Sequence, residues 1–404
     1  MPEMKAVMVI CDGMGDRPIG SLGYKTPLQT AKKPNFDRVA KDGMCGLMYT
    51  IGPGITPGSD TAHLALLGYD PVPIYTGRGP FEAMGIGMEV RPGDVAFRCN
   101  FATVDGNKVI DRRAGRIRDG TQELAAAVSG MEIEGVKIIV REGVEHRGVL
   151  ILRGEGLDPH VGDIDPHKEQ VPMLVSKALK PSAEKTARIL NTFTTESMKI
   201  LSESDLNKGR ERPANAILAR GPGQAPHIPQ FQEKHGMKGA VVVGIPLVRG
   251  LCRFAGLEVR DVQGATGSID TNFEGKARAV AAALKTNDFV LLHFKAPDVY
   301  SHDRKPAGKV KGVQDIDRAI GIMLEEIGDE AVIALTADHT TPCEVGDHTA
   351  DPVPLAIWGK GLRADAVKKY DEISCASGMH NGVRGVDLIP LLKGYANRSA
   401  KYGA

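Results

Sequence analysis

Long apolar runs are missing from this 404-residue chain, and none approaches the ~20 residues that a membrane-spanning helix requires. Aromatic residues make up only 5% of the sequence, and the charged residues, 25% of it, balance to a formal net charge of +1. Proteins that bind nucleic acid or a membrane surface usually carry excess positive charge, and many stack bases on aromatic rings. The composition therefore argues against membranes and nucleic acids as partners.

Closely spaced cysteines are also missing. The six cysteines are scattered and form no Cys-x-x-Cys motif: Cys11, Cys45, Cys99, Cys252, Cys343 and Cys375. Zinc ribbons and redox-active thiols depend on such pairs, so we expect small buried or half-buried thiols in a reducing compartment. The sequence opens on a strand pattern rather than on a basic segment followed by an apolar one, which predicts a cytoplasmic location and no export.

Three short apolar segments alternate with helical patterns, and each is followed by an aspartate. The segments cover residues 7–10, 289–292 and 331–335. Apolar runs of this kind are typical of buried parallel strands, which predicts an α/β fold. The aspartates just beyond them are Asp12, Asp298 and Asp338. Because ligands of open parallel sheets bind at the carboxyl ends of the strands, these carboxylates mark a candidate site.

The two ends of the chain differ from its middle. Residues 1–74 and 256–404 alternate strand and helix patterns and carry every metal-ligand candidate. Residues 75–255 hold short β-rich runs, a long helical pattern over 182–203, and a Gly- and Pro-rich segment from Arg220 that predicts a rigid loop. We predict that 75–255 form a smaller α+β domain inserted into the larger one. The alternative is one continuous domain with this poorly patterned stretch inside a single sheet.

Histidines follow the same strands as the aspartates. His302 comes four residues after Asp298, a spacing that lets both side chains face one point on a helical turn. His339 directly follows Asp338, so the two side chains can reach different ions from a loop. His348 lies nine residues beyond His339. Together with Asp12, these residues supply enough ligands for two metal sites with open positions.

The combination of these residues carries the prediction of a metal centre. A single aspartate after a strand is more often a turn or helix-cap residue, and a single histidine is usually a hydrogen-bonded surface group. Several such residues at neighbouring strand ends would bury charge at a cost unless a cation joined them. Mixed carboxylate and imidazole donors suit Mn²⁺, Zn²⁺, Co²⁺ or Fe²⁺ better than Ca²⁺.

A candidate hydroxyl nucleophile precedes the helical pattern that starts near residue 59. Ser59 is placed as the N-cap of that helix, where free backbone N–H groups and the positive end of the dipole favour a phosphate. A divalent ion nearby would lower the pKa of the hydroxyl and activate it. Thr56 and Thr61 are rival hydroxyls, but Thr61 would fall inside the helix and Thr56 before the Pro-Gly turn. Ser59 is the predicted nucleophile.

Short motifs lie at intervals along the chain and include Pro-Gly-Ser-Asp-Thr-Ala-His, Lys-Ala-Pro-Asp and Thr-Ala-Asp-His. Their positions span nearly the whole sequence: 12–18, 57–63, 77–83, 98–103, 111–116, 295–298, 336–339 and 348–354. In combination they resemble the cofactor-independent phosphoglycerate mutases of the archaeal type, within the alkaline phosphatase superfamily. The resemblance implies an alkaline-phosphatase-like three-layer domain with a mostly parallel central sheet, plus an inserted smaller α+β domain.

The resemblance also implies two divalent metal ions, with Mn²⁺ favoured and Mg²⁺, Co²⁺ or Zn²⁺ as alternatives, and no bisphosphoglycerate. One ion would be held by Asp12, Ser59, Asp338 and His339, and the other by Asp298, His302 and His348. Ser59 would become phosphorylated. The chain departs from the family at Ser301, where the family usually has Gly, so the backbone next to His302 is harder to predict.

The implied activity is an isomerase reaction of glycolysis and gluconeogenesis that interconverts 3-phosphoglycerate and 2-phosphoglycerate. Ser59 would take the phosphoryl group, and the free glycerate would turn and take it back on its other hydroxyl. The two ions would steady the attacking and leaving oxygens. The expected partner is therefore a small phosphorylated acid, and the sequence indicates no oligomeric state.

Arginines of the middle segment are candidates for binding this substrate. Guanidinium groups bind carboxylates and phosphates through two parallel hydrogen bonds, and an inserted domain would retain glycerate and keep water from the phosphoserine. The predicted substrate-binding residues are Arg98, Arg112, Arg116 and Arg220, in a segment that also carries Arg113 and Arg118. The candidates for proton transfer to glycerate are His160, Asp163, Asp165 and His167.

Three other functions share parts of this pattern. A phosphohydrolase would use the same metals and Ser59 but let water resolve the phosphoserine. A phosphopentomutase or a small-molecule kinase-like relative would act on a different substrate, although the basic middle segment favours a small anionic acid over a sugar. A metal-stabilised binding protein would have no need of a hydroxyl at a helix start beside metal ligands. The mutase is the favoured function.

Overall fold

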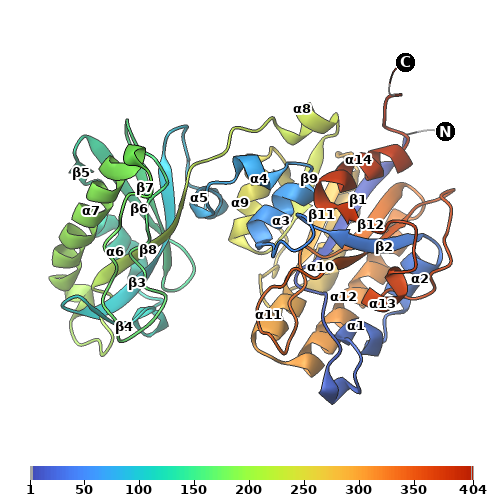
Figure 1. Ribbon diagram of the computed structural model, residues 1–404, viewed down its shortest axis with the longest axis horizontal. Coiled ribbons are helices and arrows are strands. Elements are labelled where there is room, and N and C mark those ends of the chain that lie inside the picture. Colours follow the sequence, from blue (N-terminus) through green and yellow to red (C-terminus); the bar gives the residue numbers. More distant parts are fainter. Residues whose placement is uncertain (1–2, 402, 404) are drawn as a thin grey trace. The chain divides into compact units, whose positions relative to one another are not determined.

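The computed structural model describes residues 3–401 and residue 403 (Figure 1). The chain divides into two compact units. The larger unit contains the residues up to 73 and those from 228 onward, and the smaller unit contains residues 74–227. The sequence analysis placed the segment 228–255 in the middle domain. This segment lies in the larger unit, because its strand β9 (Gly239–Val242) pairs with a strand of that unit's sheet.

The larger unit is built on an eight-stranded sheet. In spatial order the strands are β10 (Glu258–Val259), β9, β11 (Phe289–Phe294), β1 (Lys5–Cys11), β12 (Ala331–Thr336), β13 (Val353–Trp358), β2 (Met44–Tyr49) and β14 (Val383–Arg384). Only β13 runs antiparallel to its two neighbours, and the other pairs are parallel. This sheet confirms the predicted α/β fold with a mostly parallel central sheet.

The three strands that the sequence analysis singled out, β11, β1 and β12, lie side by side in this sheet. Val7 of β1 is level with Val290 of β11 and with Ile333 of β12. Every residue of β11 and β12 is buried, and so are all residues of β1 after Lys5. Strands buried on both faces must be apolar on both, which explains their continuous apolar sequences.

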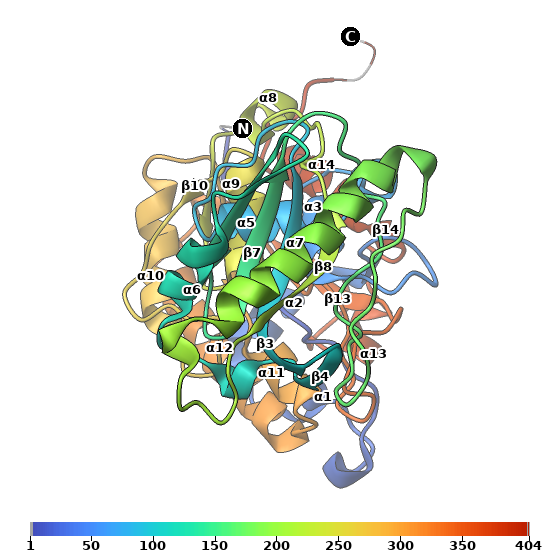
Figure 2. The same cartoon turned by 90° about the vertical axis from the view of Figure 1, so that its left-hand side faces the viewer.

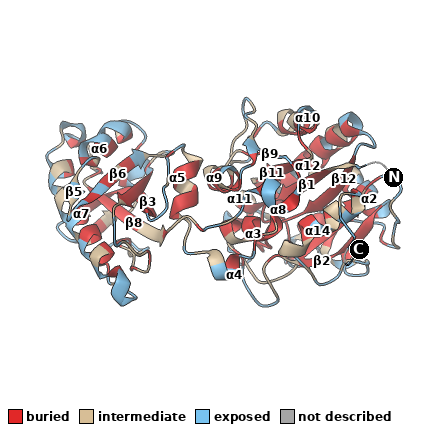
Figure 3. Ribbon diagram, turned by 90° about the horizontal axis from the view of Figure 1, so that it is seen from above, coloured by how far each residue is buried: buried red, intermediate tan, exposed pale blue. Residues whose placement is uncertain are grey.

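Helices cover both faces of the sheet (Figures 1 and 3). On one side α12 (Pro306–Ile327) packs against α10 (Phe273–Leu284) and α2 (Pro34–Lys41), and on the other α3 (Ser59–Leu66) packs against α9 (Pro246–Phe254) and α14 (Gly385–Tyr395). Shorter helices complete the set: α1 (Pro27–Thr30), α4 (Pro71–Ile74), α8 (Phe231–His235), α11 (Ala296–His302) and α13 (Glu372–Cys375). Among the residues described, no helix is long and apolar enough to cross a membrane.

The smaller unit is an α+β structure on a six-stranded antiparallel sheet. Its strands are β3 (Val95–Asp105), β4 (Lys108–Asp111), β5 (Glu132–Ile133), β6 (Val136–Glu142), β7 (Arg147–Arg153) and β8 (Ala216–Gly223). The helices α6 (Thr121–Val128) and α7 (Glu184–Ser202) pack on one face, and Figure 2 shows α7 running across the strands. The helix α5 (Gly79–Gly85) packs against β3, β7 and β8.

Side chains of β3 alternate between two apolar clusters, as the period of a strand requires. Phe97, Cys99 and Phe101 belong to the larger cluster, which also contains residues of α6 and α7. Ala96 belongs to the smaller cluster with Ala83 of α5. Residues level with Ala96 therefore share the face that α5 covers in part.

The Gly- and Pro-rich segment that begins at Arg220 is strand rather than loop at its start. β8 continues to Gly223, because the backbone keeps pairing with β3, where Gly223 lies level with Ala96. The prediction of a rigid loop from Arg220 was therefore wrong for these first residues. The predicted burial of the cysteines is confirmed, since all six are buried.

Candidate metal centre and anion-binding face

The carboxyl ends of β11, β1 and β12 bring the three predicted aspartates together. Asp12 directly follows β1, Asp338 lies two residues beyond β12, and Asp298 lies in α11, which follows β11. Each of the three is at most 1% exposed. Buried carboxylates in one place repel one another unless cations balance their charge.

Lys295 supplies one of these cations. Its ammonium nitrogen lies 2.9 Å from Asp12 Oδ2 and 2.6 Å from Asp298 Oδ2. Although burial opposes ionisation, the ammonium lowers the pKa of both carboxyl groups below their ordinary values, and the two carboxylates raise the pKa of Lys295. The sequence analysis gave this residue no role, although the lysine in the Lys-Ala-Pro-Asp motif was the available signal.

Asp338 lies in a different environment. Its Oδ1 accepts hydrogen bonds from the backbone N–H groups of Gly13, at 3.1 Å, and His339, at 3.0 Å. Its Oδ2 is buried and meets no hydrogen-bond donor within the residues described. Burial and the neighbouring Asp12 carboxylate raise the pKa of Asp338 well above its ordinary value. A buried oxygen in this condition calls for a cation or a proton.

One group of ligand atoms contains Asp12, Asp338 and His339, all within 4.8 Å of one another. His339 Nε2 lies 3.4 Å from Asp12 Oδ1 and 3.3 Å from Asp338 Oδ2. Ser59 Oγ lies 3.2 Å from the same nitrogen. The structure thus brings together the four residues predicted for the first ion. Two carboxylates, an imidazole and a hydroxyl form a donor set that fits a divalent transition metal.

A second group contains Asp298, His339 and His348. His348 Nε2 lies 3.7 Å from Asp298 Oδ1, and the rings of His339 and His348 stack with their centroids 3.5 Å apart. His302 reaches the same carboxylate from the next turn of α11, with its Nε2 3.3 Å from Asp298 Oδ2. The residues predicted for the second ion therefore converge on one carboxylate, and His339 adjoins both groups.

Backbone carbonyls hold the Nδ1 atoms of His348 and His302. The Nδ1 of His348 lies 2.8 Å from the Pro57 oxygen, and that of His302 lies 2.9 Å from the Gly346 oxygen. A proton on Nδ1 leaves Nε2 free to bind a metal, which is the usual arrangement around metal-binding histidines. Ser301 does not disturb this geometry, because α11 continues through it.

Ser59 is the first residue of α3 and not its N-cap. The N-cap is Gly58, whose backbone N–H donates to Thr61 Oγ1 at 3.1 Å. The prediction of Ser59 as the cap was wrong, because Gly58 takes that position and its N–H is bound by the hydroxyl of Thr61, three residues after Gly58. The hydroxyl of Thr61 is engaged in this way, and Thr56 is exposed. Ser59 Oγ, which caps nothing, is directed at His339 instead.

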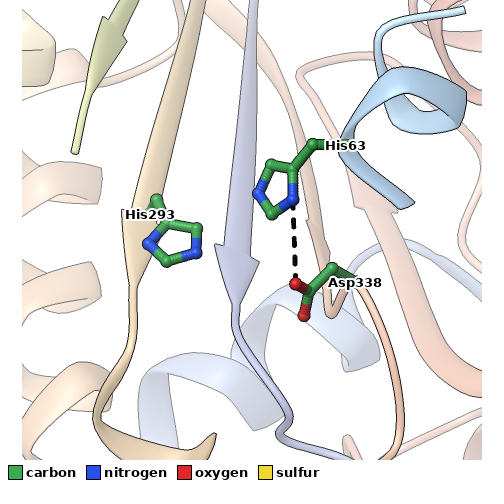
Figure 4. A group of neighbouring side chains, drawn as sticks. All are labelled: His63, His293 and Asp338. Atoms are coloured by element: carbon green, nitrogen blue, oxygen red, sulfur yellow. Dashed lines mark ion pairs between the residues drawn. The ribbon is translucent and has the colours of Figure 1, made fainter. Parts of the chain in front are cut away.

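Two histidines that the sequence analysis missed adjoin the first group (Figure 4). His63 of α3 and His293 of β11 have ligand atoms within 4.8 Å of each other and of one on Asp338. His63 Nδ1 lies 2.6 Å from the Ser59 carbonyl oxygen, and His293 Nε2 lies 3.0 Å from Asp12 Oδ2. Burial lowers the pKa of both imidazoles, to about 3 for His63. Both are therefore neutral groups that orient a predicted ligand.

One face of the smaller unit collects positive charge. Arg98 of β3 and Arg220 of β8 lie directly opposite each other. Like charges in this position destabilise a sheet unless an anion lies between them. A β-carbon added to Gly221 would lie 3.5 Å from Arg78 Cγ and 4.0 Å from Arg98 Cγ, so the stems of these side chains converge. Arg147 lies level with Asn100, two residues along β3. We call Arg78, Arg98, Arg147 and Arg220 the arginine face.

The charges of the arginine face are incompletely balanced. Burial lowers the pKa of Arg98 to about 10, and the neighbouring Arg78, Arg220 and Arg147 lower it further against the opposing effect of Glu82. The Arg98 guanidinium forms no hydrogen bond or ion pair within the described part of the chain. Desolvated guanidinium groups without a carboxylate partner are suited to bind an incoming anion.

The other two predicted arginines lie in different surroundings. Arg112 makes two hydrogen bonds to Asp165, at 2.8 Å and 2.6 Å, and Arg220 Nε lies 3.5 Å from the same carboxylate. Arg116 is exposed on the short turn Ala114–Arg116. The structure therefore connects Arg112 to Arg220 through Asp165, whereas Arg116 stands apart in the exposed turn.

The residues predicted for proton transfer divide into two clusters. His167 Nε2 lies 3.0 Å from Asp163 Oδ2, and its Nδ1 lies 3.4 Å from an Arg220 nitrogen. Asp163 also accepts a hydrogen bond from the backbone of Gly221. His160 instead pairs with Asp158 at 2.6 Å. Asp163, Asp165 and His167 therefore border the arginine face, and His160 belongs to a separate pair.

Known proteins are similar to this chain in sequence and in fold. The family model described as 2,3-bisphosphoglycerate-independent phosphoglycerate mutase matches residues 40–207. Mutases of that name from Methanocaldococcus jannaschii and Methanothermobacter thermautotrophicus are 47% and 46% identical, over 100% and 99% of this chain and 100% of each relative.

Two solved structures are similar over their whole length. A protein from Pyrococcus horikoshii has a TM-score of 0.88 and 36% identity, with all of both chains covered. A cofactor-independent phosphoglycerate mutase from Thermoplasma acidophilum has a TM-score of 0.73 and 39% identity, with 97% of this chain and 100% of that chain covered. The similarity therefore extends through both units.

Proposed function

The chain belongs to the family of 2,3-bisphosphoglycerate-independent phosphoglycerate mutases, and we propose from this membership that it is an isomerase that interconverts 3-phosphoglycerate and 2-phosphoglycerate. Relatives with this name are identical to this chain at nearly half of the positions over its full length. We propose further that this reaction serves glycolysis and gluconeogenesis and takes place in the cytoplasm. The substrate is then a small phosphorylated acid.

The observation that carries the mechanism is the position of Ser59. Ser59 is the first residue of α3, a helix of eight residues. Its hydroxyl lies 3.2 Å from His339 Nε2, beside the two carboxylates and the imidazole of the first group. We propose that Ser59 is the nucleophile and becomes a phosphoserine. The backbone N–H groups at the start of α3 favour the negative phosphoryl group beside it.

We propose two divalent ions on the basis of the two groups of ligands. We propose that Asp12, Ser59, Asp338 and His339 hold one ion and that Asp298, His302 and His348 hold the other. Mn²⁺ is the favoured metal for these mixed donors, with Mg²⁺, Co²⁺ or Zn²⁺ as alternatives. When bound, such ions lower the pKa of the attacking hydroxyl and neutralise the charge on the transferred group. The unpartnered Oδ2 of Asp338 supports this assignment.

The proposed reaction has two transfers. The Ser59 oxygen forms a bond to phosphorus while the bond to the substrate oxygen breaks, and that oxygen leaves as a glycerate hydroxyl with the proton that Ser59 gives up. The glycerate then turns, and its other hydroxyl takes the phosphoryl group and returns a proton to Ser59. Because the same groups serve both directions, positioning and electrostatics supply most of the catalysis.

A mutase must also retain glycerate between the transfers, and we propose that the smaller unit does so through the arginine face. Arg98 and Arg220 would bind an anionic group of the substrate, with Arg112 set in place by Asp165. Asp163 and His167 would exchange protons with the glycerate hydroxyls. Arg116 stays a prediction from sequence, and its exposed position gives it no added support.

A chelation experiment tests this function. The protein is stripped with a chelator, and isomer formation and phosphate release from 3-phosphoglycerate are followed before and after Mn²⁺ is added back. We expect isomer formation that depends on Mn²⁺ and little phosphate release. Ser59→Ala removes the nucleophile, and Thr56→Ala is the matched control because its exposed hydroxyl lies three residues away. Phosphate release in excess of isomerisation would identify a phosphohydrolase instead.

A further inference from the structure

A buried hydroxyl joins the two groups of ligands. Thr341 Oγ1 lies 2.9 Å from His339 Nδ1 and donates a hydrogen bond to Asp298 Oδ1 at 3.0 Å. Thr341 is completely buried. His339 belongs to both groups and Asp298 to the second, so one hydroxyl touches the shared histidine and a carboxylate of the second group.

The position of the hydroxyl is fixed from several sides. The backbone N–H of Thr341 donates to the Gly15 oxygen at 3.1 Å, and its carbonyl accepts from the buried Lys309 ammonium at 2.9 Å. Gly13, at a φ of +63°, approaches so closely that a β-carbon there would lie 2.8 Å from Thr341 Oγ1. The hydroxyl therefore has little room for another orientation.

Counting protons assigns the tautomer of His339. A threonine hydroxyl has one proton, and an ionised carboxylate can only accept, so the proton of Thr341 goes to Asp298. Thr341 must then accept the hydrogen bond from His339, which places the imidazole proton on Nδ1. The lone pair of His339 is thereby on Nε2, the nitrogen that lies near Ser59, Asp12 and Asp338.

This tautomer is the one that a metal ligand requires. Without Thr341, the proton could shift to Nε2, where it would bond to a neighbouring carboxylate oxygen at 3.3–3.4 Å and close the ligand position. We propose that Thr341 is a positioning residue that keeps the lone pair of His339 on Nε2 and ties this ligand to Asp298. The inference rests on the metal role proposed above for both residues.

The test compares four proteins by titration with Mn²⁺ alone. Thr341→Val keeps the shape but removes the hydroxyl, and Thr341→Ser keeps the hydroxyl. Thr340→Val is the matched control, because it removes the adjacent buried hydroxyl, whose partner is the Pro352 carbonyl. We expect Mn²⁺ affinity about 10- to 100-fold weaker in Thr341→Val, as for other residues that orient metal ligands. Affinity in Thr341→Ser and Thr340→Val should stay within about threefold of the wild type on the same scale.

A second measurement needs no variant, so it decides the matter even if Thr341→Val does not fold. ¹⁵N spectra of the chelated wild-type protein, labelled at histidine, should show His339 with its proton on Nδ1. A proton on Nε2 would overturn the inference, and so would equal losses in Thr341→Val and Thr340→Val or unchanged affinity in Thr341→Val. A wild-type protein that binds no Mn²⁺ would instead contradict the proposed function.

Discussion

Each unit of the chain holds one cluster of incompletely balanced charge, negative in the larger unit and positive in the smaller. In the larger unit, two of the three buried aspartates share one ammonium, and one oxygen of the third, Asp338, meets no donor in the part of the chain described. In the smaller unit, arginines lie opposite each other on paired strands, and Arg98 has no carboxylate partner within the described residues. The first arrangement favours cations and the second favours anions. Both preferences accord with the proposed metal-dependent reaction on a phosphorylated acid.

The difference also shows where each unit gives up stability for function. A protein that only needed to fold would pair these groups or replace them, because buried charge without a partner is costly. The comparison therefore predicts opposite responses to mutation. Removing a surplus charge should harm activity but relieve the fold, whereas removing a balancing charge should harm the fold.

Removal of the surplus carboxylate should have the largest effect. Asp338→Asn keeps the acceptor for Gly13 and His339 but loses the charge on Oδ2, so isomerisation should fall by on the order of 10³-fold or more. In the chelated protein, the same change should raise the melting temperature, because it relieves repulsion with Asp12. Kinetics and thermal unfolding of the same preparation check both parts. A lower melting temperature in chelator would contradict the account of surplus charge.

Removal of the balancing ammonium should act in the opposite way. Lys295→Met leaves Asp12 and Asp298 without their shared cation, and breaking a buried ion pair typically costs about 3 kcal/mol or more. We expect a lower melting temperature in chelator and a larger rise on adding Mn²⁺ than in the wild type. Lys276→Met is the control, since this buried ammonium contacts the His293 carbonyl and, among the residues described, no carboxylate. An equal rise in melting temperature on adding Mn²⁺ in both variants would show that Lys295 does not balance the charge of Asp12 and Asp298.

On the arginine face, removing a surplus positive charge should weaken substrate turnover without lowering the stability of the fold. Arg98→Met should lower kcat/KM by about 10- to 100-fold, the contribution of one or two charge-assisted hydrogen bonds. The melting temperature should not fall, because the like-charge pair with Arg220 is relieved. Arg188→Met, an exposed arginine of α7 paired with Glu134, is the matched control and should leave kcat/KM unchanged. Equal kinetics in the two variants would exclude Arg98 from the substrate site.

The smallest effect is expected from Glu372, a half-buried acid outside both regions. Burial raises the pKa of Glu372 from 4.5 to about 7, although Thr26 and the Asp16 backbone donate to it. A raised folded-state pKa means that stability is present at low pH and is lost as pH rises from about 4.5 through 7. The melting temperature of the wild type should therefore fall over this range by roughly 2–4 °C more than that of Glu372→Gln. Melting temperatures of the two proteins that change in parallel with pH would contradict the raised pKa of Glu372.

The larger unit could be predicted from sequence to a greater extent than the smaller one. The apolar strands followed by Asp12, Asp298 and Asp338 indicate both the sheet and the site, because the carboxyl ends of parallel strands lie at one edge of the sheet. His63 and His293 escaped notice because each lies among apolar residues, where a histidine is usually part of the core. Only the fold shows that they touch Asp338 and Asp12.

The arginine face depends on pairing between strands that are distant in sequence. Arg98 and Arg220 are more than a hundred residues apart, and the glycines and proline after Arg220 resemble a loop, so their register could not be predicted. Similarly, β9 is a strand of four residues, and its pairing with β11 links segments about fifty residues apart, which is why residues 228–255 were placed in the wrong unit.

Covalent transfer through Ser59 is the central claim, and the most direct measurement is to trap it. Mn²⁺-loaded protein is mixed with 3-phosphoglycerate, quenched in acid during turnover, and the peptide that contains residues 57–63 is analysed by mass spectrometry. We expect a phosphoryl group on Ser59 that is absent from chelated protein and from Ser59→Ala. Full isomerisation by Ser59→Ala, or phosphorylation at another residue during turnover, would contradict the account.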